Sequence, residues 1–133
     1  MHTATQNDIA YRLESDKPFS TVAQNLETIS PKHQFRVLAV HDVQATLAEK
    51  GFERGPLKII EVCNAGFANE ALNKDVNVSL FMPCRYSVYE DSGKTIVTLA
   101  RPSVISQMLP DSGLEEMAAK VEETLVTIMK EAI

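Results

Sequence analysis

Two cysteines are the residues of this 133-residue chain best suited to chemistry. Cys63 ends a predicted strand, and Cys84 begins the next. If these strands are antiparallel neighbours, the thiols meet at one edge of a sheet, where they could support redox, persulfide or soft-metal chemistry. A helix beginning after Asn64 would favour the Cys63 thiolate. Because no C-x-x-C motif or basic cluster accompanies them, the preferred interpretation is that both are small buried hydrophobic residues.

His41 is the second candidate. It ends a predicted strand on the side of Phe35 and Val37, and the adjacent Asp42 points to the other face and does not orient it. A hydrogen-bonded structural histidine is the preferred interpretation, and a pocket-lining acid–base group or axial haem ligand is the alternative. A zinc site would require His41 to converge with both cysteines. No motif indicates haem or a metal, so the cofactor stays open.

Four further residues mark a candidate pocket or interface. Glu61 lies within an apolar strand, so its carboxylate either faces water or pairs with Arg85 or Lys58. Arg85 and Tyr89 share a strand face and could bind an anion or a partner chain, although a solvated face is the preferred interpretation. Tyr86 lies on the opposite face, which is the natural core face.

Length and charge limit the classes of function. The chain is predicted to form one domain over residues 1–133, with a flexible tail over residues 1–7. A net charge of -5 disfavours nucleic acid as a partner. The sequence contains neither an apolar run long enough for a membrane helix nor a secretory signal, so we predict a cytoplasmic protein without a membrane partner.

Apolar periodicity predicts the elements of the first half of the chain. A strand covers residues 8–15, and a helix capped by Ser20 follows and ends before Pro31. The next strand covers residues 35–43. It has apolar residues on both faces, which predicts an interior position in the sheet. A short helix over residues 44–50 follows.

The second half contains three further strands and two helices. Strands are predicted over residues 57–63, 84–90 and 94–100, the last two joined by a tight turn at Asp91, Ser92 and Gly93. Asn64 caps a helix over residues 65–72, and Pro102 ends the last strand. Asp111 or Ser112 caps the longest helix, residues 113–132, which carries an apolar stripe that must be buried.

These elements, in the order β-α-β-β-β-β-α, predict an α+β fold: a curved, mainly antiparallel five-stranded sheet packed by an N-terminal helix and a long C-terminal helix. The leading functional hypothesis is a homodimeric small-molecule binding module, with a pocket between the sheet and the C-terminal helix. We expect Tyr86, Val88, Leu125 and Met129 to line that pocket. The alternatives are a thiol-based redox or sulfur-handling protein and a structural interaction protein. No catalytic signature is found, so enzymatic activity is left open and is not favoured.

Several motifs together resemble one family over residues 8–132. Residues 61–64 read Glu-Val-Cys-Asn, residues 83–91 read Pro-Cys-Arg-Tyr-Ser-Val-Tyr-Glu-Asp, and Gly-Lys-Thr follows at 93–95. The chain resembles the bacterial and archaeal family called domain of unknown function 302. The resemblance implies a TATA-binding-protein-like α+β fold that is commonly dimeric, and it implies no reaction. Many members have Cys-Asn-Pro where this chain has Ala65 after Cys-Asn.

Overall fold

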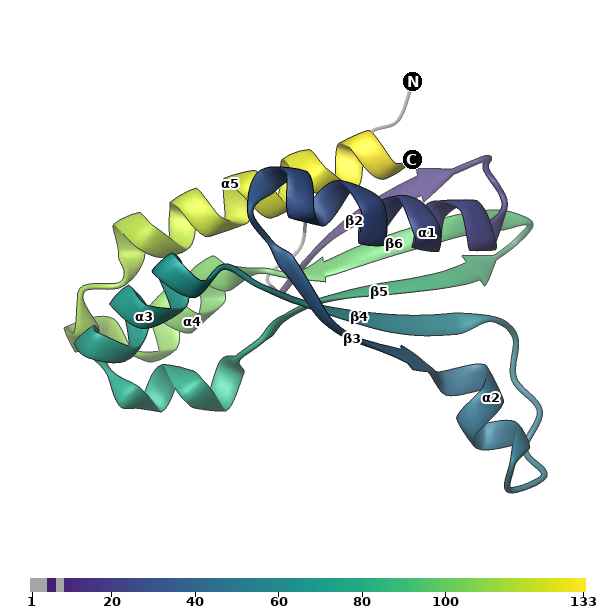
Figure 1. Cartoon of the computed structure of the whole chain (residues 1–133), viewed down its shortest axis with the longest axis horizontal. Coiled ribbons are helices and arrows are strands. Elements are labelled where there is room, and N and C mark those ends of the chain that lie inside the picture. Colours follow the sequence, from purple (N-terminus) through teal and green to yellow (C-terminus); the bar gives the residue numbers. More distant parts are fainter. Residues whose placement is uncertain (1–4, 7–8) are drawn as a thin grey trace.

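The protein is described by a computed structural model that covers residues 5–6 and 9–133 (Figure 1). The strands are β1 (Thr5–Gln6), β2 (Ala10–Ser15), β3 (Arg36–Asp42), β4 (Leu57–Cys63), β5 (Cys84–Asp91) and β6 (Lys94–Ala100). The helices are α1 (Phe19–Ile29), α2 (Val43–Ala48), α3 (Ala65–Lys74), α4 (Pro102–Met108) and α5 (Glu115–Ala132), with 3₁₀ turns η1 (Ser30–His33), η2 (Val76–Phe81) and η3 (Pro110–Ser112). The rest of the predicted tail, and the first residue of the predicted strand 8–15, lie outside the described residues.

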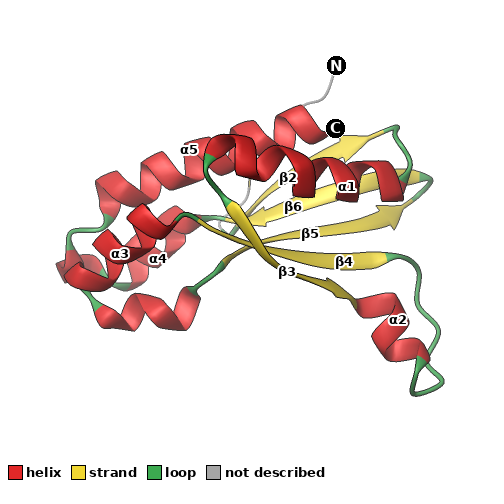
Figure 2. Cartoon of the chain, viewed as in Figure 1, coloured by secondary structure: helices red, strands yellow, loops and turns green. Residues whose placement is uncertain are grey.

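The strands form one open antiparallel sheet in the order β1-β2-β6-β5-β4-β3. The predicted α+β class and all five predicted strands are confirmed, and the two-residue β1 adds a short edge. Helices α1 and α5 lie side by side on one face of the sheet (Figure 2). No helix within residues 9–133 covers the centre of the other face, which we call the uncovered face.

A two-residue turn fixes the register of the central hairpin. Asp91 pairs with Lys94, and the two residues between them, Ser92 and Gly93, have φ values of 52° and 79°. Positive φ at both positions is the geometry that matches the twist of the flanking strands. The turn therefore sets which residues of β5 and β6 face the helices.

Strand β3 lies at the edge of the sheet, and the prediction of an interior position was wrong. Its register against β4 shifts between Val37 and Ala39, which is a bulge. A bulge interrupts the alternation of side chains. Apolar residues therefore reach both faces without a second neighbouring strand, and Leu38 and Val40 remain 51% and 36% exposed.

The expected caps at Ser20 and at Asp111 or Ser112 were also wrong. Helix α1 begins after Pro18, which acts as its N-cap without a side-chain bond, and Ser20 lies inside the helix. Helix α5 begins after Leu114, again without a side-chain cap. Asp111 and Ser112 instead belong to η3, because a separate helix, α4, occupies the chain between β6 and this turn.

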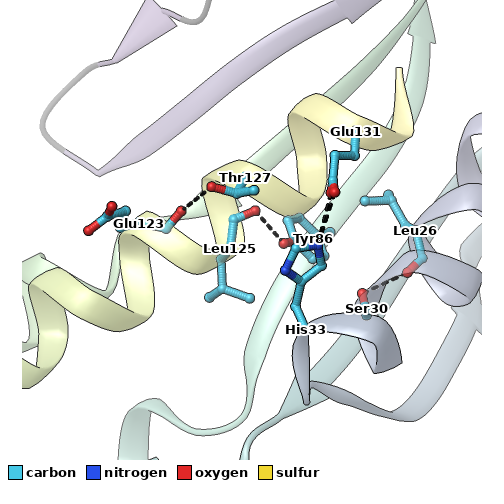
Figure 3. A network of polar contacts seen from close by, with 8 residues as sticks. All are labelled: Leu26, Ser30, His33, Tyr86, Glu123, Leu125, Thr127 and Glu131. Carbon is cyan, nitrogen blue, oxygen red and sulfur yellow. Dashed lines mark hydrogen bonds and ion pairs between the residues drawn. The ribbon is translucent and has the colours of Figure 1, made fainter.

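The main core lies between the helices and the covered face of the sheet. Tyr86 of β5 is fully buried there, and its hydroxyl donates a 2.6 Å hydrogen bond to the Leu125 carbonyl of α5 (Figure 3). In the same view, His33 Nε2 lies 2.8 Å from a Glu131 carboxylate oxygen, which ties η1 to the last turns of α5. Burial raises the pKa of Tyr86 well above its ordinary value, so the phenol stays a donor. No helix in the described part of the chain is long and apolar enough to cross a bilayer.

Candidate functional site

An apolar cavity of about 80 Å³ lies where β4 ends and β5 begins. Helices α3 and α4 and the first turns of α5 gather at this end of the sheet (Figure 1), and residues of all three line the cavity. The lining residues are Phe35, Val62, Cys63, Asn64, Phe67, Ala68, Ala71, Val78, Phe81, Met82, Pro83, Cys84, Pro102, Ile105, Ser106, Leu114, Met117, Ala118 and Val121.

Asn64 positions the α3 wall of this cavity. Its side-chain oxygen accepts from the Phe67 N–H at 3.0 Å, which confirms the predicted cap, and its amide donates to the Gln34 carbonyl at 3.1 Å. The cap starts α3 directly at the end of β4. Phe67 is thereby brought within 6.4 Å of the buried Phe35, measured between ring centroids, with 27° between the ring planes.

Both cysteines line the cavity, because β4 and β5 are antiparallel neighbours and Val62 pairs with Cys84. Burial raises the pKa of the Cys63 thiol. Burial first, and then the nearby Cys63, raise the pKa of Cys84 to about 11, against a small opposing effect of Arg85. The direction of the shift in the Cys63 pKa is opposite to the one expected from the start of α3, and its cause is burial. Both thiols are neutral at pH 7.

Sequence reasoning missed much of the cavity wall. Met82 and Met117 bring two thioethers to the cavity that holds the two thiols, and Pro102 and Ile105 contribute α4. Pro102 marks the end of the last predicted strand, and proline is also common at the first position of a helix. That signal could have revealed α4.

The residues expected to line the pocket lie elsewhere. Tyr86, Val88, Leu125 and Met129 have no exposed surface and form close-packed core between the sheet and the second half of α5. The cavity instead contacts the first half of α5. A buried apolar stripe looks the same in sequence whether its packing is complete or leaves a gap.

Three polar side chains lie in a row on the uncovered face. His41 Nε2 of β3 is 3.1 Å from one oxygen of Glu61 on β4, and Arg85 Nε of β5 is 3.4 Å from the other. Asp42 takes no part, because its carboxylate accepts from the Ala45 N–H and caps α2. Farther along the same face, Glu14 first and then Tyr89 raise the pKa of the Arg12 guanidinium of β2.

His41 does not join the two cysteines. It pairs with Ile59, which lies four residues before Cys63 on β4. At 3.3 Å per residue, Ile59 and Cys63 are about 13 Å apart along the strand. Among the residues that the structure describes, no group of three or more His, Cys, Asp or Glu side chains could hold a metal ion. The thiols and the histidine therefore belong to two separate places on the molecule.

Comparison with known proteins places this architecture in a recognised group. The model of a family described as "Domain of unknown function DUF302" matches residues 11–132. A crystal structure of an uncharacterized conserved DUF302 protein from Bacillus stearothermophilus is similar, with 29% sequence identity and a TM-score of 0.90. The similarity covers 96% of this chain and 100% of that one. None of the curated proteins compared matches the chain.

Proposed function

The chain belongs to the DUF302 family, whose description assigns no activity, and we propose from the geometry of its cavity that the protein is a binding module for a small apolar ligand. The single observation that carries this proposal is a gap lined almost entirely by apolar side chains at the junction of the sheet, α3, α4 and α5. Asn64 and Ser106 are the polar exceptions.

The size of the cavity limits the ligand. Its volume is about half that of an engineered cavity of roughly 150 Å³ that stays dry and binds benzene. A few apolar atoms fill it without rearrangement, and larger groups require side chains such as Met117 to move. Burying apolar surface of the ligand contributes about 25 cal/mol of favourable binding free energy per Å² removed from water. Binding is therefore driven by burial and needs no reaction at the thiols.

Benzene and xenon are suitable probes for the test. Because a ligand that binds only the folded state stabilises it, either probe should raise the melting temperature of the wild-type protein. Ala118→Leu fills the cavity and should abolish that increase, whereas Ala45→Leu on the exposed side of α2 should leave it intact. An equal increase in the wild-type and Ala118→Leu proteins, or no increase in either, overturns the proposal.

We further propose a homodimer formed through the uncovered face. The motivation is that this face lacks a covering helix and carries the partly exposed Ile59 beside charges of both signs at Glu61 and Arg85. Such a face is self-complementary across a two-fold axis, because each cation of one copy can meet a carboxylate of the other. Light scattering tests this, and a monomer mass at micromolar concentration contradicts it.

Thiol chemistry is the second candidate function. It is favoured by the presence of Cys63 and Cys84 in one cavity and disfavoured by their raised pKa values, because the thiolate is the reactive form. Intact mass of the purified protein distinguishes the two functions. A persulfide or disulfide mass supports sulfur chemistry, and an apolar adduct that dissociates on unfolding supports the binding module.

A further inference from the structure

A second recess, of about 140 Å³, adjoins the apolar cavity between α3 and α5. Phe67 and Met117 line both the cavity and this recess, so their side chains form the partition between them. Phe67 is half-buried and Met117 is 7% exposed. Methionine has three rotatable bonds and adapts its shape readily. A ligand in the cavity can therefore reach solvent past Met117.

The outer part of the recess carries charge of both signs. Glu70 and Lys74 come from α3, and Glu116 and Lys120 come from α5. Lys120 Nζ lies 3.6 Å from Glu116, while Lys74 Nζ donates to the Gly113 carbonyl at 2.9 Å. A lysine ammonium has three donors, so the Gly113 contact leaves Lys74 two more. The four side chains sum to zero charge, so the recess matches a group that carries one charge of each sign.

We propose that the ligand is a small zwitterionic amphiphile of the α-amino-acid type with an unbranched apolar side chain. Its side chain occupies the cavity past Met117, and its ammonium and carboxylate lie in the recess against Glu70 and Lys74. This inference rests on the proposed function, since it requires the cavity to take an apolar group. Beyond that function, it specifies the polar head group of the ligand and the side from which the ligand enters the cavity.

Four molecules with six-carbon chains test the head group: norleucine, hexanoate, hexylamine and 1-hexanol. Dissociation constants from calorimetry or NMR titration should rank norleucine tightest. Because exposed ion pairs are individually weak, removing one charge should weaken binding about two- to fivefold. Increasing the salt concentration should reduce the difference between the dissociation constants of norleucine and hexanol. The inference is overturned if hexanol, hexanoate or hexylamine binds as tightly as norleucine.

Variants separate this inference from the proposed function. Glu70→Gln and Lys74→Gln should each raise the dissociation constant of norleucine about two- to fivefold and leave that of hexanol unchanged. Lys50→Gln, at an exposed residue, should change neither dissociation constant. Ala118→Leu should abolish binding of both ligands. If hexanol binds and norleucine has no advantage, the inference fails and the proposed function stands. If none of the four binds and benzene and xenon are also inert, both fail.

Discussion

The surroundings of Cys84 keep its thiol neutral, and the thiol should therefore react slowly with alkylating reagents. Its pKa is raised from 9.0 to about 11, chiefly by burial. At pH 8 the thiolate fraction is therefore about a hundredfold below that of an unperturbed thiol. In a Cys63→Ser protein the contribution of Cys63 is lost but burial still raises the pKa of Cys84, so the rate of alkylation by iodoacetamide should keep increasing about tenfold per pH unit beyond pH 9. A plateau near pH 9 in the folded protein contradicts this, and the urea-unfolded chain, which should plateau there, is the control.

The same displacement makes the free energy of unfolding depend on pH. Below pH 9 the thiol is protonated in both states and its stabilising contribution is complete. Between pH 9 and about 11 the unfolded chain ionises first, so the protein loses stability, by about 2–3 kcal/mol for this group at full titration. Urea titrations at pH 8 and pH 10.5 should show a larger loss for the wild type than for Cys84→Ala, and equal losses contradict the expectation.

Among the elements, α4 is tied to α5 by one buried carboxylate. Glu122 is 8% exposed, and one of its oxygens accepts from both the N–H and the hydroxyl of Ser103, at 3.1 and 2.7 Å. Its other oxygen lies 3.6 Å from Arg101 Nε. This carboxylate binds the first turn of α4 and neutralises the residue before it. It therefore holds one wall of the cavity in place.

Glu122→Gln should lower the free energy of unfolding by about 2–4 kcal/mol, because the partly buried Arg101 loses the negative charge beside its guanidinium and Ser103 loses a charged acceptor. Denaturant titration measures the loss, and hydrogen exchange should increase first in α4. The matched control is Glu123→Gln, since Glu123 is the exposed neighbour on the same helix. Similar losses in the two variants would mean that α4 is held by apolar contacts alone.

Local signals predicted the elements whose causes are local. The hairpin followed from Gly93, and the α3 cap from Asn64, because a positive φ and a side-chain acceptor act within a few residues. The cysteines' shared location followed once their strands were paired. The edge position of β3 and the cavity could not be predicted in this way. The bulge at Val37 and the gap beside Met117 depend on segments distant in sequence.

At the scale of the whole molecule, α1 and α5 cover one face of the sheet and leave the other face, which carries polar and charged side chains around Ile59, without a helix. Ser87 lies at the middle of the uncovered face, between Ile59 and Thr98 on the neighbouring strands. If two copies associate there, Ser87→Arg places two like charges near the two-fold axis. The measured mass should fall to that of a monomer while the circular dichroism spectrum stays unchanged.

Gln24→Arg is the control for this prediction, since Gln24 is exposed on α1, away from the sheet. It should retain the dimer mass. A Ser87→Arg protein that keeps a dimer mass places the interface elsewhere, for example at the exposed edge of β3. Loss of the folded spectrum would show instead that Ser87 is needed within the monomer.

The pairing of β2 with β6 joins Ala10 to Ala100. A ribosome adding about 5–20 residues per second needs roughly 5–20 s to make the chain between them. Throughout that interval β2 has no β6 to pair with, and the inner side of α1, with Val22 and Leu26, lacks its cover from α5. The nascent chain thus presents a bare strand edge and an apolar helix face together. Protection by a chaperone during synthesis, rather than stability after release, would then set the yield of folded protein.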